Sequence, residues 1–374
     1  MMTARISHAT HSIFRTAAAM LLMPALLAAA PRATGAEMPD DPAPLRCRLD
    51  EAPSSKDGEI LAAVTIMEGD RAGEQATVSC PRKYAGVLRR GDMCIVRFTQ
   101  RGAEILEPAR DRAIYVLLGL LGACVVLTMG ARGARVLASI GLALVLVVFV
   151  LLPLALRGWP VAAVAGGIAV VLCAAGMPLV GGWNRKSLYA AAGALFALAA
   201  AVWLPVTAAK LLAFTGLEVE FGTFFHLDVP LWYSPALARV DFHQLLVAGM
   251  LIASLGATMD AAMSVSTAVW EVKLAAPDAD RRHLMRAGLA VGRDVMSTMV
   301  LAVVLVYAGY QFEMLLLFHI RGLPYAPGLL LNHEEIAVEV IHMLCTVLAL
   351  GLSIPATVLI AAHFLSRGNE TKNA

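Results

Sequence analysis

The chain has 374 residues, of which 59% are hydrophobic and 16% are charged, and its formal net charge is +2. This apolar share exceeds that of a soluble globular domain, so we expect a lipid bilayer to surround most of the chain. The near-neutral charge, with Lys and Arg scattered between apolar runs, argues against nucleic-acid binding.

The first 36 residues have the pattern of a secretory signal. Arg5 and Arg15 precede an apolar run over residues 16–30, and small residues follow it. The run is too short for an ordinary membrane span. We therefore predict a signal peptide over residues 1–36, with an uncleaved signal anchor as the alternative. Either would place the following segment outside the cytoplasm.

Residues 37–110 are polar, and short β-favouring stretches alternate there with glycine-containing turns. Two of these turns contain Gly69–Asp70 and Gly91–Asp92, and glycine adopts positive φ at little cost. The pattern predicts a small all-β extracytoplasmic domain.

Three of the six cysteines, Cys47, Cys80 and Cys94, lie in this β-rich region. The sequence has no CxxC or Cys/His spacing typical of a metal site. In an exported domain one pair could oxidise and leave one thiol over, and three buried free thiols are the alternative. The sequence leaves their disulfide state open.

A membrane domain over residues 111–366 follows, with seven apolar runs separated by short polar segments. Each run can cross about 30 Å of hydrocarbon, which needs about 20 helical residues. The runs lie at about residues 113–130, 136–156, 160–180, 187–209, 244–265, 295–318 and 338–364. We predict an α-helical polytopic membrane protein with about seven transmembrane helices, a kink or tilt at Pro355, and a cytoplasmic tail at residues 367–374.

The distribution of basic residues supports one orientation, because an exported N-terminal domain forces the first span to run inward. The predicted cytoplasmic loops and tail contain Arg132, Arg135, Arg185, Lys186, Lys273, Arg281, Arg282, Arg286, Arg293, Arg367 and Lys372. The predicted external segments next to the spans contain fewer: Arg110, Arg112, Arg157, Lys210, Arg239 and Arg321. This bias obeys the positive-inside rule and predicts a multi-pass inner-membrane protein with a cytoplasmic C-terminus.

The fifth run carries small and polar residues at steps of three or four, which places them on one helix face. We call this face the small-polar stripe; it comprises Gly249, Ala253, Gly256, Asp260, Ser264, Thr267 and Glu271. A carboxylate near the bilayer centre costs about 3 kcal/mol or more, so the stripe should face other helices, a partner protein or water.

The sixth run is predicted to begin at Arg293 and Asp294, on the same side of the membrane as Asp260, with Thr298 one turn further on. An ion pair between Asp260 and Arg293 is then within reach. A neutralised pair that fixes helix register and a role in transport are the two alternatives.

A second single-face series lies at the outer end of the seventh run, where Glu335, Glu339 and His342 are followed by Thr346. Carboxylates and a histidine at this spacing can exchange protons or hold a cation. The alternative is a solvated amphipathic start to the helix with a packed, hydrogen-bonded His342.

The sequence has no Walker loop and no HExxH, GxSxG or CxxCH motif. These motifs mark phosphoryl transfer, hydrolysis and haem attachment, so we expect neither an enzyme nor a bound cofactor.

The blocks around Asp260 and Arg293 carry a family resemblance. They read Gly256-Ala-Thr-Met-Asp-Ala-Ala-Met-Ser264, continuing Val-Ser-Thr-Ala-Val-Trp-Glu271, and Gly292-Arg-Asp-Val-Met-Ser-Thr298, with shorter blocks at Asn184-Arg-Lys186, Glu334-Glu335-Ile-Ala337 and Ile354-Pro-Ala-Thr357. On these blocks, over about residues 58–364, the chain resembles the YibE/F family of membrane proteins. The resemblance implies an integral membrane protein of bacterial type without an established biochemical activity.

The sequence supports two functional hypotheses. The first is a permease-like protein that moves or senses a small solute or ion, with Asp260, Asp294 and neighbouring hydroxyls along a polar path. The second is a non-transporting scaffold or accessory subunit whose small-polar stripe packs against a membrane or envelope protein partner.

Overall fold

The structure is a computed structural model that describes residues 44–56, 59–99, 102–216, 239–320 and 331–370. The predicted signal segment at residues 1–36 lies outside the described residues. The chain divides into two compact units, one over residues 36–127 and one that contains residues 128–374. Each unit is described by itself.

The first unit contains a small β-barrel, which confirms the predicted all-β domain. Its strands are β1 (Leu45–Leu49), β2 (Ser54–Lys56), β3 (Glu59–Ile66), β4 (Gln75–Ser79), β5 (Met93–Thr99) and β6 (Gly102–Pro108). The strand order is β1-β5-β6-β4-β3-β2, and an additional β1–β3 pairing closes the sheet. All pairs are antiparallel except β4–β6. Closure of the sheet leaves few free strand edges.

The barrel core follows from the two-residue period of its strands. Ala62, Val64 and Ile66 of β3 are 3%, 0% and 0% exposed, whereas the residues between them face outward. Cys47 of β1 lies opposite Cys94 of β5 in the same core, and Cys47, Cys80 and Cys94 are free thiols. The turn glycines behave as expected, since Gly69 and Gly91 have φ of 84° and 92°.

Helix α2 (Asp111–Met129) follows the last strand and is the first of the apolar helices. Asp111 at its start forms an ion pair with Arg46 of β1, with 3.0 Å between the guanidinium nitrogen and the carboxylate oxygen. This contact ties the barrel to the beginning of α2 within the first unit.

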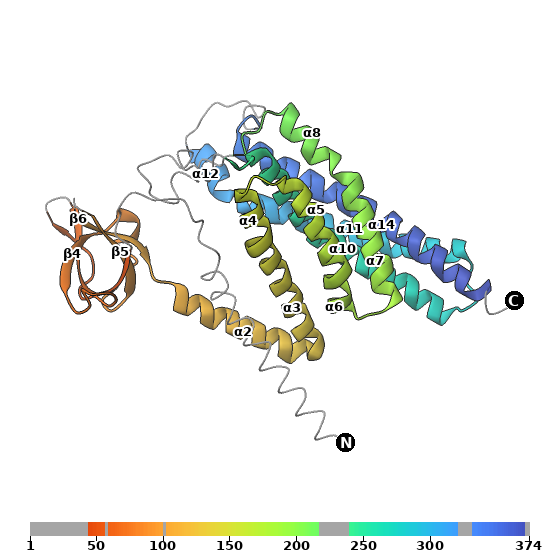
Figure 1. Cartoon of the computed structure of the whole chain (residues 1–374), viewed down its shortest axis with the longest axis horizontal. Coiled ribbons are helices and arrows are strands. Elements are labelled where there is room, and N and C mark those ends of the chain that lie inside the picture. The colour runs from red at the N-terminus through yellow and green to blue at the C-terminus, as the bar shows by residue number, and fades with distance from the viewer. Residues whose placement is uncertain (1–43, 57–58, 100–101, 217–238, 321–330, 371–374) are drawn as a thin grey trace, which may run out of the picture. The chain divides into compact units, whose positions relative to one another are not determined.

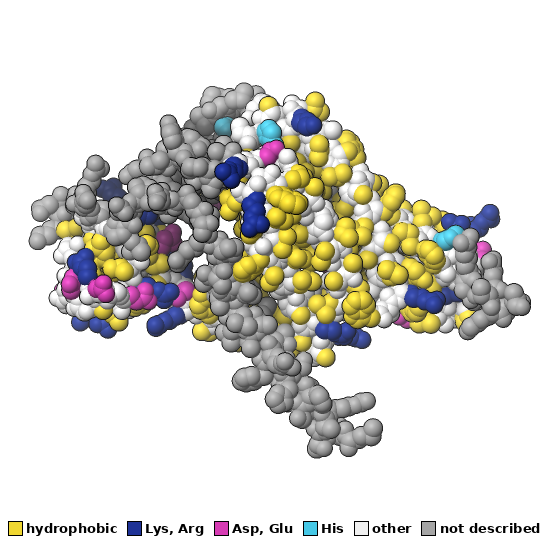
Figure 2. Space-filling model, in the orientation of Figure 1, with side chains coloured by type: hydrophobic (Ala, Val, Ile, Leu, Met, Phe, Trp, Pro, Cys, Tyr) yellow, Lys and Arg dark blue, Asp and Glu magenta, His cyan; other side chains and the backbone are white. Residues whose placement is uncertain are grey.

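The described residues contain seven helices long and apolar enough to span a membrane, which confirms the predicted polytopic α-helical architecture. After α2 the spans are built from α3 (Ala131–Leu146), η2 (Val147–Leu151) and α4 (Leu152–Leu156); α5 (Val161–Val171), η3 (Leu172–Gly176) and α6 (Met177–Gly181); α7 (Arg185–Ala201) with α8 (Trp203–Leu211); α10 (Phe242–Ala275); α11 (Arg281–Tyr310); and α14 (Glu334–Glu370). Figure 2 shows apolar side chains over much of the surface of this helical region.

Two of these spans contain a short π-helical stretch that the apolar pattern could not reveal. The wide turns η2 and η3 are each followed closely by a proline, at Pro153 and Pro178. Proline lacks an N–H and its ring crowds the preceding turn, which favours such a widening.

The sixth span differs from the prediction of residues 295–318. Helix α11 begins at Arg281, where the Asp280 side chain accepts a hydrogen bond from the His283 backbone N–H, and it ends at Tyr310. A separate helix, α12 (Phe312–Ile320), follows. Hydropathy locates the apolar part of a helix but not its polar first turns, so Arg293 and Asp294 lie well inside α11 rather than at its start.

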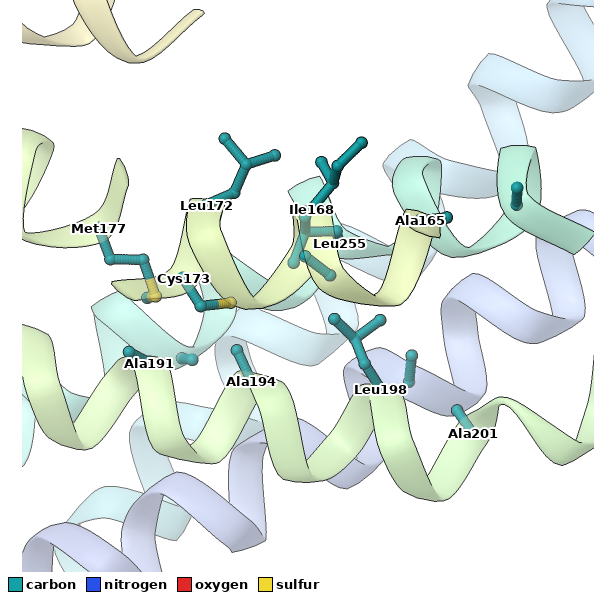
Figure 3. Close-up of a cluster of buried hydrophobic side chains, with 14 of the residues drawn as sticks. Ala165, Ile168, Leu172, Cys173, Met177, Ala191, Ala194, Leu198, Ala201 and Leu255 are labelled. Atoms are coloured by element: carbon teal, nitrogen blue, oxygen red, sulfur yellow. The ribbon is translucent and has the colours of Figure 1, made fainter. Parts of the chain in front are cut away.

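Helices α7, α10 and α14 form the centre of the bundle, and α5, α8 and α11 pack against them (Figure 1). Small side chains allow this close approach: Cys173 of η3 points toward Ala191 and Ala194 of α7 (Figure 3). At Gly193, an added Cβ would lie 2.8 Å from the Thr357 Cα of α14.

Candidate functional site

The small-polar stripe lies on the face of α10 that the described helices leave uncovered. Gly256, Asp260 and Ser264 are exposed, and a Cβ built on Gly249 or Gly256 would meet no atom within 4 Å. The opposite face of α10 is buried instead, as at Leu255. The prediction that these residues share one face is confirmed, but this face is turned away from the bundle centre.

Asp260 and Arg293 form no ion pair, and the Asp260 carboxylate has no hydrogen-bond partner among the residues that the structure describes. Gly292 packs against Val265 of α10 and Ile354 of α14. Arg293 follows it by one step of about 100° around the helix, toward the flank where Met296 meets Gly351 of α14. Arg293 therefore points away from α10.

The other predicted residues near this pair are also uncovered. Asp294 and Thr298 are exposed on α11, and the Thr298 hydroxyl donates to backbone carbonyls of its own helix, at 3.3 Å to Asp294 and 3.0 Å to Val295. On α10, Thr267 is half-buried and Glu271 is exposed. A polar path along these residues therefore lacks a second wall within the described chain.

A different group of polar residues is enclosed where α10, α11 and α14 meet. We call it the polar cluster; it comprises Ser254 of α10, Tyr307 of α11, and Glu339, His342 and Thr346 of α14. The Glu339 carboxylate Oε2 and the His342 imidazole Nδ1 lie 3.7 Å apart, a pair that is ionic when the imidazole is protonated, and the two side chains are only 16% and 17% exposed.

Hydrogen bonds and a ring contact connect the polar cluster across the three helices. The Ser254 and Thr346 hydroxyl oxygens are 3.2 Å apart, and the Thr346 hydroxyl lies 3.0 Å from the His342 carbonyl to which it donates. The Tyr307 hydroxyl is hydrogen-bonded to Thr346, and the Tyr307 ring lies with its centroid 4.9 Å from that of His342. Both alternatives for His342, packing and proton exchange, are compatible with this placement.

One atom of the polar cluster lacks a partner. The His342 Nε2 is buried and has no hydrogen-bond partner in the described part of the chain. A buried polar atom without a partner costs about 1–3 kcal/mol, so such atoms are uncommon and point to a site that takes up something else.

Glu335 and its neighbour Glu334 lie at the start of α14, outside the polar cluster. Glu335 is half-buried on the same face as Glu339. Glu334 accepts hydrogen bonds from the backbone N–H groups of Thr215 and Gly216, which follow α8. This contact anchors the beginning of α14 and is structural in character.

Sequence reasoning missed Ser254 and Tyr307. Ser254 lies on the buried face of α10, where Thr258 follows it by one turn, and a search for hydroxyls opposite the small-polar stripe would have found it. Tyr307 is an aromatic residue in an apolar run, and only the packing of α11 on α14 gives it a polar neighbour.

The described residues contain no group of three or more His, Cys, Asp or Glu side chains placed to hold a metal ion. The polar cluster offers one carboxylate, one imidazole and three hydroxyls. Its chemistry is the binding of a proton, an ion or a hydrogen-bonding solute.

Seven helices long and apolar enough to span a membrane among the described residues define a polytopic α-helical membrane protein. The family of YibE/F-like proteins matches residues 117–367, and the chain belongs to this family. The match covers the helices and begins after the β-barrel, so the resemblance expected for the outer domain stays a prediction. No curated protein and no solved structure matches the chain.

Proposed function

We propose that this protein moves or senses a small solute or ion across the membrane, and that the polar cluster is the site. The observation that carries the proposal is the ionisable pair of Glu339 and His342, which is enclosed between membrane-spanning helices. Ionisable side chains at such positions are costly in hydrocarbon and most often serve a function. The proposal is non-enzymatic.

The position of the pair also supports a permeation role. Glu339 and His342 lie on the second and third turns of α14, which begins at Glu334, and Ser254 and Tyr307 meet them from two other helices. Because three helices line the polar cluster, it can open by small shifts between them.

The proposal includes an orientation. The excess of Lys and Arg in alternate loops supports insertion in the bacterial inner membrane, with the β-barrel outside and the C-terminus in the cytoplasm. The start of α14 then faces the outside, and the polar cluster is reached from that side.

A flux measurement tests the proposal. Proteoliposomes containing the protein are given a K⁺ diffusion potential, and the movement of Na⁺, Cl⁻, phosphate and protons is followed. We expect the wild type to move at least one of these and Glu339→Gln to lose that movement. The matched control is Glu313→Gln, since Glu313 is exposed on α12. A wild type that moves none of the four, or full flux in Glu339→Gln, would contradict the proposal.

A second candidate function is supported by the uncovered small-polar stripe. Small residues let helices approach closely in lipid. The free energy of the Asp260 carboxylate would also be lower against a polar partner than in hydrocarbon. A scaffold or accessory subunit would bind a partner helix there. Gly256→Leu should then release a co-purifying membrane protein, while Gly309→Leu, at an equally open glycine of α11, should retain it. Equal recovery of the partner with both variants would exclude this role for the stripe.

A further inference from the structure

We propose that the polar cluster binds a proton, and that His342 Nε2 is the atom that takes it up. This inference rests on the proposed permease-like function and names the ion that the site handles.

The first argument concerns which ring nitrogen of neutral His342 carries the hydrogen beside the Glu339 carboxylate. The His342 Nδ1 lies 3.7 Å from the Glu339 carboxylate oxygen, which favours the neutral tautomer with the hydrogen on Nδ1 and the free electron pair on Nε2. That electron pair is buried and has no donor within the described residues. A proton is the smallest species that can bind there, and it needs no additional volume in a packed interior.

The second argument is charge. Uptake of one proton converts the neutral imidazole to imidazolium, and its positive charge then balances the Glu339 carboxylate within the pair. The release step returns the same proton, so no other reactant is needed. The Tyr307 ring lies beside the imidazole, with 4.9 Å between the two ring centroids and 53° between the ring planes.

Among the described groups that surround His342, its imidazole is the one that exchanges the proton. Glu335, Glu339 and Cys345 lie on its own helix, and α11 contributes Tyr307. Helix α10 contributes the Ser254 hydroxyl through Thr346.

The remaining charged groups of the packed helices lie elsewhere. On α10 the nearest ionisable residues to Ser254 are His243 and Asp260, eleven and six positions away. The ionisable residue of α8 is the exposed Lys210, and those of α7 are Arg185 and Lys186 at its start and Tyr189 one turn later.

The hydroxyl groups around the pair can adapt to both protonation states. Tyr307, Thr346 and Ser254 are linked by hydrogen bonds, and each hydroxyl can donate or accept as its neighbours change. The Ser254 and Thr346 hydroxyls also donate to backbone carbonyls of their own helices, at Met250 and His342, so they stay paired in either protonation state of the imidazole.

Two measurements test the inference. The protein is labelled with ¹⁵N-histidine, and the side-chain nitrogen signals are followed by NMR as a function of pH. The chain has nine histidines, and the signal missing in His342→Gln identifies His342. Proton uptake into proteoliposomes under a K⁺ diffusion potential is then recorded with an enclosed pH dye. The controls are His319→Gln and Glu313→Gln, which change exposed residues of α12.

We expect the His342 signal to report protonation between about pH 5 and pH 8, where histidine ordinarily changes charge. Proton uptake should fall to that of protein-free liposomes in His342→Gln and Glu339→Gln, and should be unchanged in both controls. A His342 that stays neutral throughout this range would overturn the inference, as would wild-type proton uptake in His342→Gln. Either result would leave the permease proposal standing if Na⁺, Cl⁻ or phosphate still moved.

Discussion

The thiols of the β-barrel are unreactive because of where they lie. Burial raises the pKa of Cys47 to about 11, and burial together with nearby Cys47, Cys80 and Asp92 raises the pKa of Cys94 to about 12. The thiolate is the reactive form, so both side chains stay protonated and inert near neutral pH.

This chemistry predicts a labelling result. Iodoacetamide at neutral pH should leave Cys47 and Cys94 unmodified in the folded protein and should modify both after denaturation, as measured by mass spectrometry of the peptides. The structure has both thiols free. A peptide pair joined by a Cys47–Cys94 disulfide would contradict the prediction.

The same pKa values predict a pH dependence of barrel stability. The pKa of Cys94 is raised from 9.0 to about 12, so the folded state holds its proton where the unfolded state releases it. The contribution is fully present below pH 9.0 and is lost as the pH rises toward about 12. Hydrogen exchange of the strand amides should therefore show weakening protection above pH 9.0, after correction for the intrinsic exchange rate. The weakening should be smaller in a Cys47→Ala/Cys94→Ala variant; an identical pH profile in that variant would rule the thiols out.

At the scale of helices, the packing of α7 on α14 depends on Gly193. A Cβ at this position would lie 2.8 Å from the Thr357 backbone, which has no room to move without shifting the helix. Gly193→Ala should destabilise the protein by about 1–3 kcal/mol, the usual cost of overpacking. The control is Gly167→Ala on α5, where an added Cβ meets no atom within 4 Å. Thermal unfolding in detergent measures the difference, and equal unfolding temperatures would show that this contact is not tight.

The helices also show what the sequence could and could not predict. The seven spans were predictable because crossing the bilayer requires length and apolar composition, which are local properties. The start of α11 was not predictable, because the first turns of this helix, which begin at Arg281, are polar and give no hydropathy signal. Hydropathy also does not reveal the π-helical turns η2 and η3 that precede Pro153 and Pro178.

The candidate site was predictable only in part. The spacing of Asp260 and Ser264 placed them on one face, and the spacing of Glu339 and His342 did the same. Which of these faces is covered depends on how distant segments pack. The structure encloses Glu339 and His342 and leaves Asp260 uncovered, and no local pattern distinguishes the two cases.

At the scale of the whole molecule, the proposed orientation makes a direct prediction. A reporter that is active only in the cytoplasm should be active when fused after Glu370, at the end of α14, and inactive when fused in the loop between α4 and α5 at Gly158. The positive-inside bias is the reason for this expectation. The reverse pattern of activity would invert the assignment of every loop.

The central claim is that the protein binds a solute or ion at the polar cluster inside its helical bundle. The most direct test is the thermal stability of the purified protein against a panel of cations, anions and small metabolites and across a pH series, because any ligand specific to the folded state, the proton included, raises stability by mass action. We predict that at least one compound, with the proton counted among them, stabilises the wild type and His319→Gln but not His342→Gln. If no compound stabilises the wild type, or if the stabilisation survives in His342→Gln and is lost in Asp260→Asn, the claim is contradicted.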